Sequence, residues 1–435
     1  MNIDFKDTAY KLNLIFISLA ILTSCHYSQN LSENEAICKI SGEGFEARDI
    51  RVCHVWSDMW NGDEYQEIKV RNGRFDAEVI LDTNQVYEIC IPHPEHGFAA
   101  YRTAEFFYSK DGVRFGLKTG IDGERVVLSE PTGNNRTYYD YKNHRDSLFM
   151  EWYAGLMESQ DSLNNMGMMF DPYWEDLLDK LNDGNLPQSV RDNITLEVNK
   201  MSMSGENRTT EGQKWMQEWN DYRSSKQAYD LNHLTACEPS HIGLYMIMDN
   251  IHISQGRNED ISEWLNIYDH KFRNICESSR MHKLINEAKI AAAMVEGRCF
   301  VDFTLPDRFG REQNLSELIE GKIAILELWA SWCRSCRVTA KSFKPLYEKY
   351  NKYGFTVIGI AREYRDKEKW LNALDADAYP WPNLVAMEDE HKIWAQYGVP
   401  DAAGRTFLID KDGIIIKINP TAQDVEEYLK ALTKE

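Results

Sequence analysis

The pattern of hydrophobic and polar positions changes twice along the chain. From about Glu35 to Ser129, apolar and polar residues alternate in short runs that end at Pro, Gly, Asn or Asp, which is typical of β-strands. Asn72-Gly73 separates two such runs and predicts a tight hairpin turn. Strands are predicted at residues 67–71, 74–80, 86–91, 104–108, 113–117 and 125–128. The pattern therefore predicts an all-β N-terminal module over residues 26–136.

The periodicity becomes helical in the middle of the chain, over residues 137–296. Trp215, Trp219 and Tyr222 follow one another at helical spacing, and residues 285–295 contain no helix breaker. The region is rich in Trp, Tyr and Met, and apolar stripes of this kind are typical of helix packing rather than of ligand sites. We therefore predict a central all-α region and interpret the stripe as helix packing; the role of the region stays open.

Strands and helices alternate from Phe300 onward, which is typical of an α/β domain. Asp412-Gly413 predicts a hairpin turn between the last two strands. The strands are expected at residues 323–329, 355–361, 406–410 and 414–418, and the helices at 333–350, 367–374 and 423–432. The chain is thus predicted to be a multidomain protein, with an α/β domain at residues 297–435.

The first 25 residues have the features of an exported protein. Lys6 and Lys11 precede an apolar run that is too short to span a bilayer and is typical of a signal peptide. The run ends at Leu22-Thr23-Ser24-Cys25, which resembles a bacterial lipobox, although an ordinary signal peptide that contains a cysteine is the alternative. We expect Cys25 to carry lipid and to anchor the protein to a membrane of the cell envelope. An outer membrane is expected, with the protein facing the periplasm or the cell surface.

Length and charge indicate the number of domains and exclude one class of partner. A chain of 435 residues exceeds what one hydrophobic core usually organises, so two or three domains are expected. Lys and Arg number 49 and Asp and Glu number 69, which gives a formal charge of −20. An acidic excess of this size repels polyphosphate, and no basic cluster offsets it locally. Nucleic acid is therefore excluded as a partner.

The strongest chemical signal is the pair of cysteines in Trp332-Cys333-Arg334-Ser335-Cys336. It lies where a buried strand is followed by the start of a helix, and the helix amides and dipole stabilise a thiolate there. Cys333 is predicted to be the attacking thiolate and Cys336 the resolving cysteine of a redox disulfide. A CxxC is also half of a zinc site, but the chain has no second CxxC. No cofactor or metal is expected, and residues 93–96 are predicted to be a turn.

Nine cysteines are present, and six remain after Cys25, Cys333 and Cys336 are set aside. They are widely scattered and lack the density of a disulfide scaffold, and several have apolar neighbours. For cysteines with apolar neighbours, such as Cys53 and Cys90, we favour buried free thiols over structural disulfides, and the state of the others stays open. The six are Cys38, Cys53, Cys90, Cys237, Cys276 and Cys299.

Residues 296–435 resemble the TlpA/ResA branch of thioredoxin-like proteins. The resemblance rests on residues 302–307, 315–318 and 321–337, on Phe355 to Ile360, and on Phe407 to Gly413. It implies a thioredoxin fold and dithiol–disulfide exchange in the bacterial envelope. The implied partners are disulfide-containing envelope proteins as substrates and a membrane electron donor. The β region is similar to an uncharacterised module that often precedes such domains.

The same resemblance implies roles for residues outside the CxxC. Glu327, six residues before Cys333, matches the buried acid that accepts a proton from the resolving cysteine; a solvated strand face is the alternative. Trp332, Ala403 and Gly404 are expected in the substrate groove. Gly404 stands where the family usually has a cis-proline, unless an insertion brings Pro400 there. Helix 333–350 also has Lys341 in place of the usual proline.

Three functions remain open. The first is a disulfide reductase or isomerase that acts on envelope proteins. The second is a peroxiredoxin-like peroxidase, which requires a Pro/Thr-rich loop before a single peroxidatic cysteine; Ala330-Ser331-Trp332 does not provide one. The third is a surface-binding lipoprotein with residual redox activity, which the missing cis-proline favours.

Overall fold

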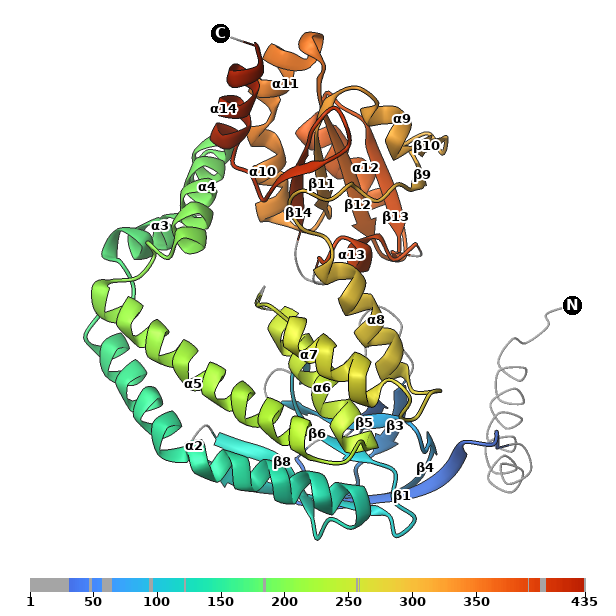
Figure 1. The fold of residues 1–435 in the computed structure, drawn as a ribbon. Coiled ribbons are helices and arrows are strands. Elements are labelled where there is room, and N and C mark those ends of the chain that lie inside the picture. The colour runs from blue at the N-terminus through green and yellow to red at the C-terminus, as the bar shows by residue number, and fades with distance from the viewer. Residues whose placement is uncertain are drawn as a thin grey trace, which may run out of the picture. The chain divides into compact units, whose positions relative to one another are not determined.

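The computed structural model describes residues 31–433 except 47–48, 57–64, 94–96, 121–122, 183–184, 256, 258, 390 and 400–403. Contacts between residues divide the chain into two compact units, Met1–Lys142 and Asn143–Glu435. Strands come first, helices follow, and an α/β domain ends the chain, as the sequence predicts (Figure 1). The predicted signal segment and Cys25 lie outside the described residues. Among those described, no helix combines the length and the apolar character needed to cross a membrane.

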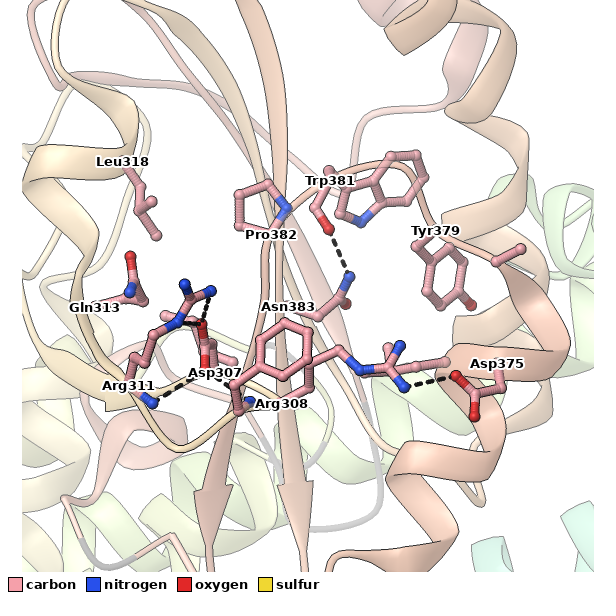
Figure 2. A pocket seen from close by; sticks show the side chains of 14 residues that line it. Asp307, Arg308, Arg311, Gln313, Leu318, Asp375, Tyr379, Trp381, Pro382 and Asn383 are labelled. Atoms are coloured by element: carbon pink, nitrogen blue, oxygen red, sulfur yellow. Dashed lines mark hydrogen bonds and ion pairs between the residues drawn. The ribbon is translucent and has the colours of Figure 1, made fainter.

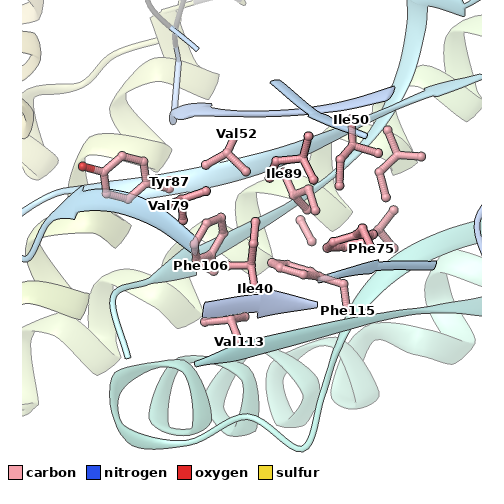
Figure 3. Close-up of a cluster of buried hydrophobic side chains, with 14 of the residues drawn as sticks. Ile40, Ile50, Val52, Phe75, Val79, Tyr87, Ile89, Phe106, Val113 and Phe115 are labelled. Carbon is pink, nitrogen blue, oxygen red and sulfur yellow. The ribbon is translucent and has the colours of Figure 1, made fainter. Parts of the chain in front are cut away.

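The N-terminal module contains two four-stranded sheets, β4-β1-β7-β8 and β3-β2-β5-β6. Its core is made by inward-facing side chains of both sheets, including Ile40 and Phe115 from the first and Val52 and Ile89 from the second (Figure 3). Strand β1 pairs antiparallel with β4 and parallel with β7. The strands are β1 (Glu35–Glu43), β2 (Asp49–His54), β3 (Tyr65–Lys69), β4 (Arg74–Asp82), β5 (Val86–His93), β6 (Gly97–Phe107), β7 (Val113–Gly120) and β8 (Gly123–Ser129).

The predicted turn at Asn72-Gly73 is present, but the strands beside it do not form a continuous hairpin. Both residues have positive φ, 51° and 73°, and Arg71 and Arg74 exchange backbone hydrogen bonds. Beyond that bridge the strands separate, because β4 pairs with β1 along its whole length while β3 pairs with β2. The side chain of Gln66 spans the opening and bonds the backbone of Ile80.

The central region is helical, as predicted. Trp215 and Tyr222 are buried against α2 together with Leu156, and the indole of Trp215 donates to the Leu156 carbonyl at 2.9 Å. These aromatic residues therefore pack helices, which confirms the structural interpretation of the stripe. The helices are α2 (Gly133–Asn165), α3 (Pro172–Asn182), α4 (Gln188–Ser204), α5 (Thr210–Ala236), α6 (His241–Gln255), α7 (Ser262–Ile267), the π-helical turn η3 (Tyr268–Phe272) and α8 (Arg280–Ala292).

The C-terminal domain is built on a five-stranded sheet in the order β13-β12-β11-β14-β15, preceded by the small β9–β10 hairpin. The first three strands are parallel to one another, and β14 and β15 are antiparallel to their neighbours. The strands are β9 (Thr304–Pro306), β10 (Glu312–Asn314), β11 (Ile323–Trp329), β12 (Phe355–Glu363), β13 (Asn383–Met387), β14 (Arg405–Ile409) and β15 (Ile415–Ile418). The helices are α9 (Leu315–Ile319), α10 (Arg334–Ser342), α11 (Lys344–Tyr350), α12 (Glu368–Asp377), α13 (Ile393–Gln396) and α14 (Ala422–Thr433), and the short 3₁₀ turn η4 (Asn351–Tyr353) follows α11.

The two faces of this sheet have separate cores. Ile325 packs with α10, α11 and α14, whereas Leu326 packs on the other face with α9 and α13. The helix predicted over 333–350 is divided at Phe343 into α10 and α11. Pro345 explains the division, because proline lacks an amide donor and its ring clashes with the carbonyl four residues earlier.

Candidate active site

The two cysteines of the CxxC lie at the junction between β11 and α10. They form a disulfide with 5.4 Å between their Cα atoms. Cys333 is the N-cap of α10, and its Sγ accepts a hydrogen bond from the amide of Cys336 at 3.3 Å. An anionic sulfur at this place would face the free amides and the positive end of the helix dipole. The geometry therefore suits a stabilised thiolate at Cys333.

Cys336 points back toward the sheet. It packs against a buried cluster that includes Trp329 of β11, Ala361 of β12 and Trp370 of α12. Because side chains alternate along a strand, Glu327 lies on the same face of β11 as Trp329. The fold thus brings the acid, the tryptophan and the second cysteine to one side of the sheet.

Glu327 is only 2% exposed, so the solvated-face alternative is wrong. Strand β11 is central in its sheet and is covered on both faces, which is why alternation gives it no solvated side. Among the described residues, the Glu327 Oε1 atom has no hydrogen-bond partner. Burial, reinforced by the negative charge of Asp377, raises the pKa of this carboxyl well above its ordinary value.

A polar cluster next to Glu327 was not found from the sequence. The Asp377 carboxylate accepts from Arg337 Nε at 2.6 Å and from the Tyr379 hydroxyl at 3.0 Å. Burial first, and then the charge of Glu327, raise the pKa of Tyr379. Arg337 directly follows Cys336, so the cluster connects the first turn of α10 to the surroundings of the buried acid. The positive charge of Arg337 is paired with Asp377.

A second missed residue is Glu363, at the end of β12. Its carboxylate accepts from the backbone N–H of Ser331 at 2.6 Å and from the Ser331 hydroxyl at 2.8 Å. Both residues are buried, and burial raises the pKa of Glu363. This contact fixes the loop that leads from β11 to Cys333. The available signal was topological, because the carboxyl ends of adjacent parallel strands meet at one edge of the sheet.

The predicted groove residues are only partly within the described chain. Trp332 is 51% exposed beside the disulfide, and Gly404, just before β14, faces Cys336 closely enough to leave no room for a side chain. Ala403 and Pro400 lie outside the described residues. Lys341 forms an ion pair with Asp192 of α4.

A pocket of about 460 Å³ is lined by the β9–β10 turn, the end of α12 and the start of β13 (Figure 2). Its wall includes Tyr379 and Asn383 but neither cysteine of the CxxC. The ion pairs Arg308–Asp375 and Arg311–Asp307 lie at its rim. The Asn383 Oδ1 atom borders Gly359, which is the residue opposite Glu327 on the neighbouring strand. Tyr379 thus belongs both to the wall of the pocket and to the polar cluster around Asp377.

Comparison with known proteins agrees with this geometry. A model of the AhpC/TSA family matches residues 297–418. The thiol-disulfide oxidoreductase ResA of Bacillus anthracis is 30% identical over 135 residues, which cover 30% of this chain and 75% of that protein. The thiol:disulfide interchange protein DsbE of Pseudomonas aeruginosa is 31% identical over 140 residues, covering 30% and 69%.

Two solved structures are also similar. The thioredoxin domain of a thiol-disulfide oxidoreductase from Bacteroides vulgatus is 22% identical, with a TM-score of 0.29, and the match covers 32% of this chain and 97% of that one. A thiol:disulfide interchange protein from Bacteroides sp. is 21% identical, with a TM-score of 0.30, covering 33% and 93%. On the strength of the sequence relatives, the chain belongs to the thiol–disulfide oxidoreductases of the ResA/DsbE type and carries their thioredoxin-like domain at its C-terminus.

Proposed function

We propose that this protein reduces disulfide bonds of cell-envelope proteins through the Cys333–Cys336 dithiol. The observation that carries the proposal is the position of the pair. Cys333 caps α10 and accepts the Cys336 amide, while Cys336 packs toward the face of the sheet that holds the buried Glu327. One sulfur is thus placed for attack and the other for resolution.

The reaction balances as two successive exchanges. The Cys333 thiolate attacks one sulfur of the substrate disulfide, which breaks that bond, forms a mixed disulfide and releases a substrate thiolate that takes up a proton. Cys336 then loses its proton and attacks the Cys333 sulfur, which releases the second substrate thiol. Two electrons have passed to the substrate, and Cys333 and Cys336 are joined. A membrane-associated dithiol donor returns the pair to its reduced form.

Glu327 is proposed as the acceptor of the proton that Cys336 loses. Burial raises the pKa of this carboxyl, which favours uptake of a proton by its ionised form. Asp377 and Tyr379 interact electrostatically with Glu327, and Tyr379 also lines the pocket in Figure 2, which supports a route for the proton to solvent on this side. Trp332, Ala403 and Gly404 are proposed to form the surface that receives the substrate.

The N-terminal segment is proposed to place this activity at a membrane. Residues 1–25 are a lipoprotein signal peptide in this proposal, and Cys25 carries the lipid of the mature protein in the outer membrane. Residues 26–136, 137–296 and 297–435 then follow as the β module, the helical region and the redox domain. Mass spectrometry of the native protein tests this part. An unmodified N-terminus at another residue, or a wholly soluble native protein, contradicts it.

The mechanism is tested by insulin reduction with the full chain and with Cys333→Ser and Cys336→Ser variants. Cys333→Ser is expected to abolish turnover, and Cys336→Ser to accumulate mixed disulfides with substrates. In the reduced protein, Cys333 is expected to react with iodoacetamide near neutral pH while Cys336 stays shielded. Equal reactivity of the two thiols, or normal turnover by Cys333→Ser, would reverse the assignment. A protein that binds envelope partners without reducing insulin would instead favour a surface-binding lipoprotein, and hydroperoxide consumption would favour a peroxidase.

A further inference from the structure

Three potential metal ligands lie together in the N-terminal module, far along the chain from the CxxC. Cys53 is on β2, and Glu88 and Cys90 are on β5. Cys53 is directly opposite Glu88 in the register of these strands, and Cys90 is opposite Arg51. Val52 and Ile89 face the core shown in Figure 3, so alternation directs Cys53, Glu88 and Cys90 to the other face of the sheet.

The distances between these ligand atoms suit a tetrahedral cation. The two sulfurs are 3.7 Å apart, and Cys53 Sγ is 3.9 Å from Glu88 Oε1. All three ligand atoms lie within 4.8 Å of one another. Two thiolates bound to Zn²⁺ at about 2.3 Å with tetrahedral angles are separated by about 3.8 Å. A sulfur and a carboxylate oxygen on the same ion are separated by about 3.5–3.7 Å. The side chains are thus already at nearly the required spacing.

Burial and charge also favour a cation. Cys53 is 2% and Cys90 0% exposed, and they form a cluster of their own, separate from the hydrophobic core that contains Cys38. Two thiolates and a carboxylate carry three negative charges, which a divalent ion and the guanidinium of Arg51 together balance. Soft thiolate ligands select thiophilic metals such as Zn²⁺ over Mg²⁺ or Ca²⁺.

The strand register argues against a direct bond between the two sulfurs. Cys53 and Cys90 are diagonal neighbours rather than directly opposite residues. Diagonal pairs in an ideal sheet are separated by about 7–8 Å, whereas the Cα atoms of a disulfide are usually about 4.4–6.8 Å apart. An ion between the sulfurs spans the longer separation without moving either strand.

We propose that Cys53, Glu88 and Cys90 form a binding site for a thiophilic divalent cation, best matched by Zn²⁺, with water in the fourth position. Binding displaces the two thiol protons to solvent and ties β2 to β5 through three protein ligands. The site lies on the face of the β3-β2-β5-β6 sheet opposite the core of the module and takes no part in the redox reaction. Glu88 and Cys90 follow Cys53 by 35 and 37 residues, so the spacing of the ligands along the sequence does not reveal the site.

The test uses the full chain in a Cys333→Ser/Cys336→Ser background, so that the redox pair cannot bind metal. The reduced protein is freed of metal with a chelator and titrated with Co²⁺ as a spectroscopic probe. We expect one Co²⁺ per chain, with thiolate-to-cobalt charge-transfer absorption and the visible bands of tetrahedral Co²⁺. Zn²⁺ should displace it with loss of both signals, and Zn²⁺ should raise the melting temperature of the protein by mass action.

Variants then locate the site. Cys53→Ser and Cys90→Ser should abolish the charge-transfer absorption, and Glu88→Gln should weaken Co²⁺ affinity by about tenfold or more. Cys38→Ala, which changes a buried thiol that bonds the Ser109 carbonyl, is the matched control and should bind like the parent. If the serine variants fail to fold, the Co²⁺ affinity of Glu88→Gln tests the location of the site. Absence of charge-transfer bands in the parent, bands that persist in the folded variants, or a Cys53–Cys90 disulfide in peptide maps of the native protein would overturn the proposal.

Discussion

Gly404 and Cys336 are in such close contact that the resolving sulfur occupies the space of a side chain. A Cβ atom added at Gly404 would lie 2.5 Å from Cys336 Sγ and 2.6 Å from the Leu328 carbonyl oxygen. Gly404 is not among the residues with positive φ, so its backbone conformation does not demand glycine. The close contact with Cys336 and Leu328 requires glycine here, and it makes this position a sensitive probe of the disulfide.

We expect Gly404→Ala to lower the free energy of unfolding of the oxidised protein by about 1–3 kcal/mol, because the Leu328 carbonyl belongs to a central strand and cannot move aside. Denaturant unfolding of the oxidised full chain measures the change. Gly155→Ala in α2 is the control, since nothing lies within 4 Å of its added Cβ. Equal stability of Gly404→Ala and the parent would contradict this account of the contact.

The stability of the protein should depend on pH through Glu327. Since the pKa of its carboxyl is raised on folding, the folded state binds more protons than the unfolded state above the ordinary value of 4.5. Stability therefore falls as pH rises from there toward the folded pKa. Glu327→Gln lacks this titration, so its stability relative to the parent should increase with pH, reaching a gain of about 1–3 kcal/mol.

Urea unfolding of both oxidised proteins between about pH 5 and about pH 9 tests this expectation. Glu348→Gln, which removes an exposed carboxylate of α11 in the same domain, serves as the control. If the stability difference between Glu327→Gln and the parent does not change with pH, a raised pKa of Glu327 is excluded as the cause of that difference.

Asp377→Asn should shift the pH dependence of disulfide exchange to lower pH. The substitution removes a negative charge that raises the pKa of Glu327 and leaves the Arg337 guanidinium without its partner carboxylate. Both effects favour the ionised form of Glu327. The measurement is the pH profile of insulin reduction. Asp375 lies on the same helix as Asp377 and forms an exposed ion pair with Arg308. Asp375→Asn breaks that pair and should leave the pH profile of insulin reduction unchanged.

Glu363→Ala should destabilise the protein by about 1–3 kcal/mol, because the buried amide and hydroxyl of Ser331 lose their acceptor. It should also change the iodoacetamide reactivity of Cys333 in the reduced protein, since the loop before α10 is no longer fixed. Glu363→Gln retains one oxygen for the amide and is expected to lose less. If alanine and glutamine behave alike in both measurements, the hydrogen bonds do not hold the loop.

Local signals in the sequence predicted the parts of the fold that depend on neighbouring residues. Strand β11 was predicted with its observed bounds, because a buried parallel strand is a continuous apolar run. The junction with α10 follows from the same run. Arg337, Asp377 and Tyr379 could not be connected, since 40 residues separate the two ends of that ion pair. Cys53 and Cys90 were expected to be isolated buried thiols, and only the β2–β5 register brings their sulfurs together.

The parallel pairing of β1 with β7 has a consequence for a chain that emerges N-terminus first. Strand β1 can pair with β4 as soon as Asp82 is available, but its other edge stays open until residues 113–115 arrive. An open edge of this kind is a template for pairing with other chains, and pairing over a long loop is slow. Until β7 has been synthesised, the nascent module therefore exposes one unpaired edge of β1.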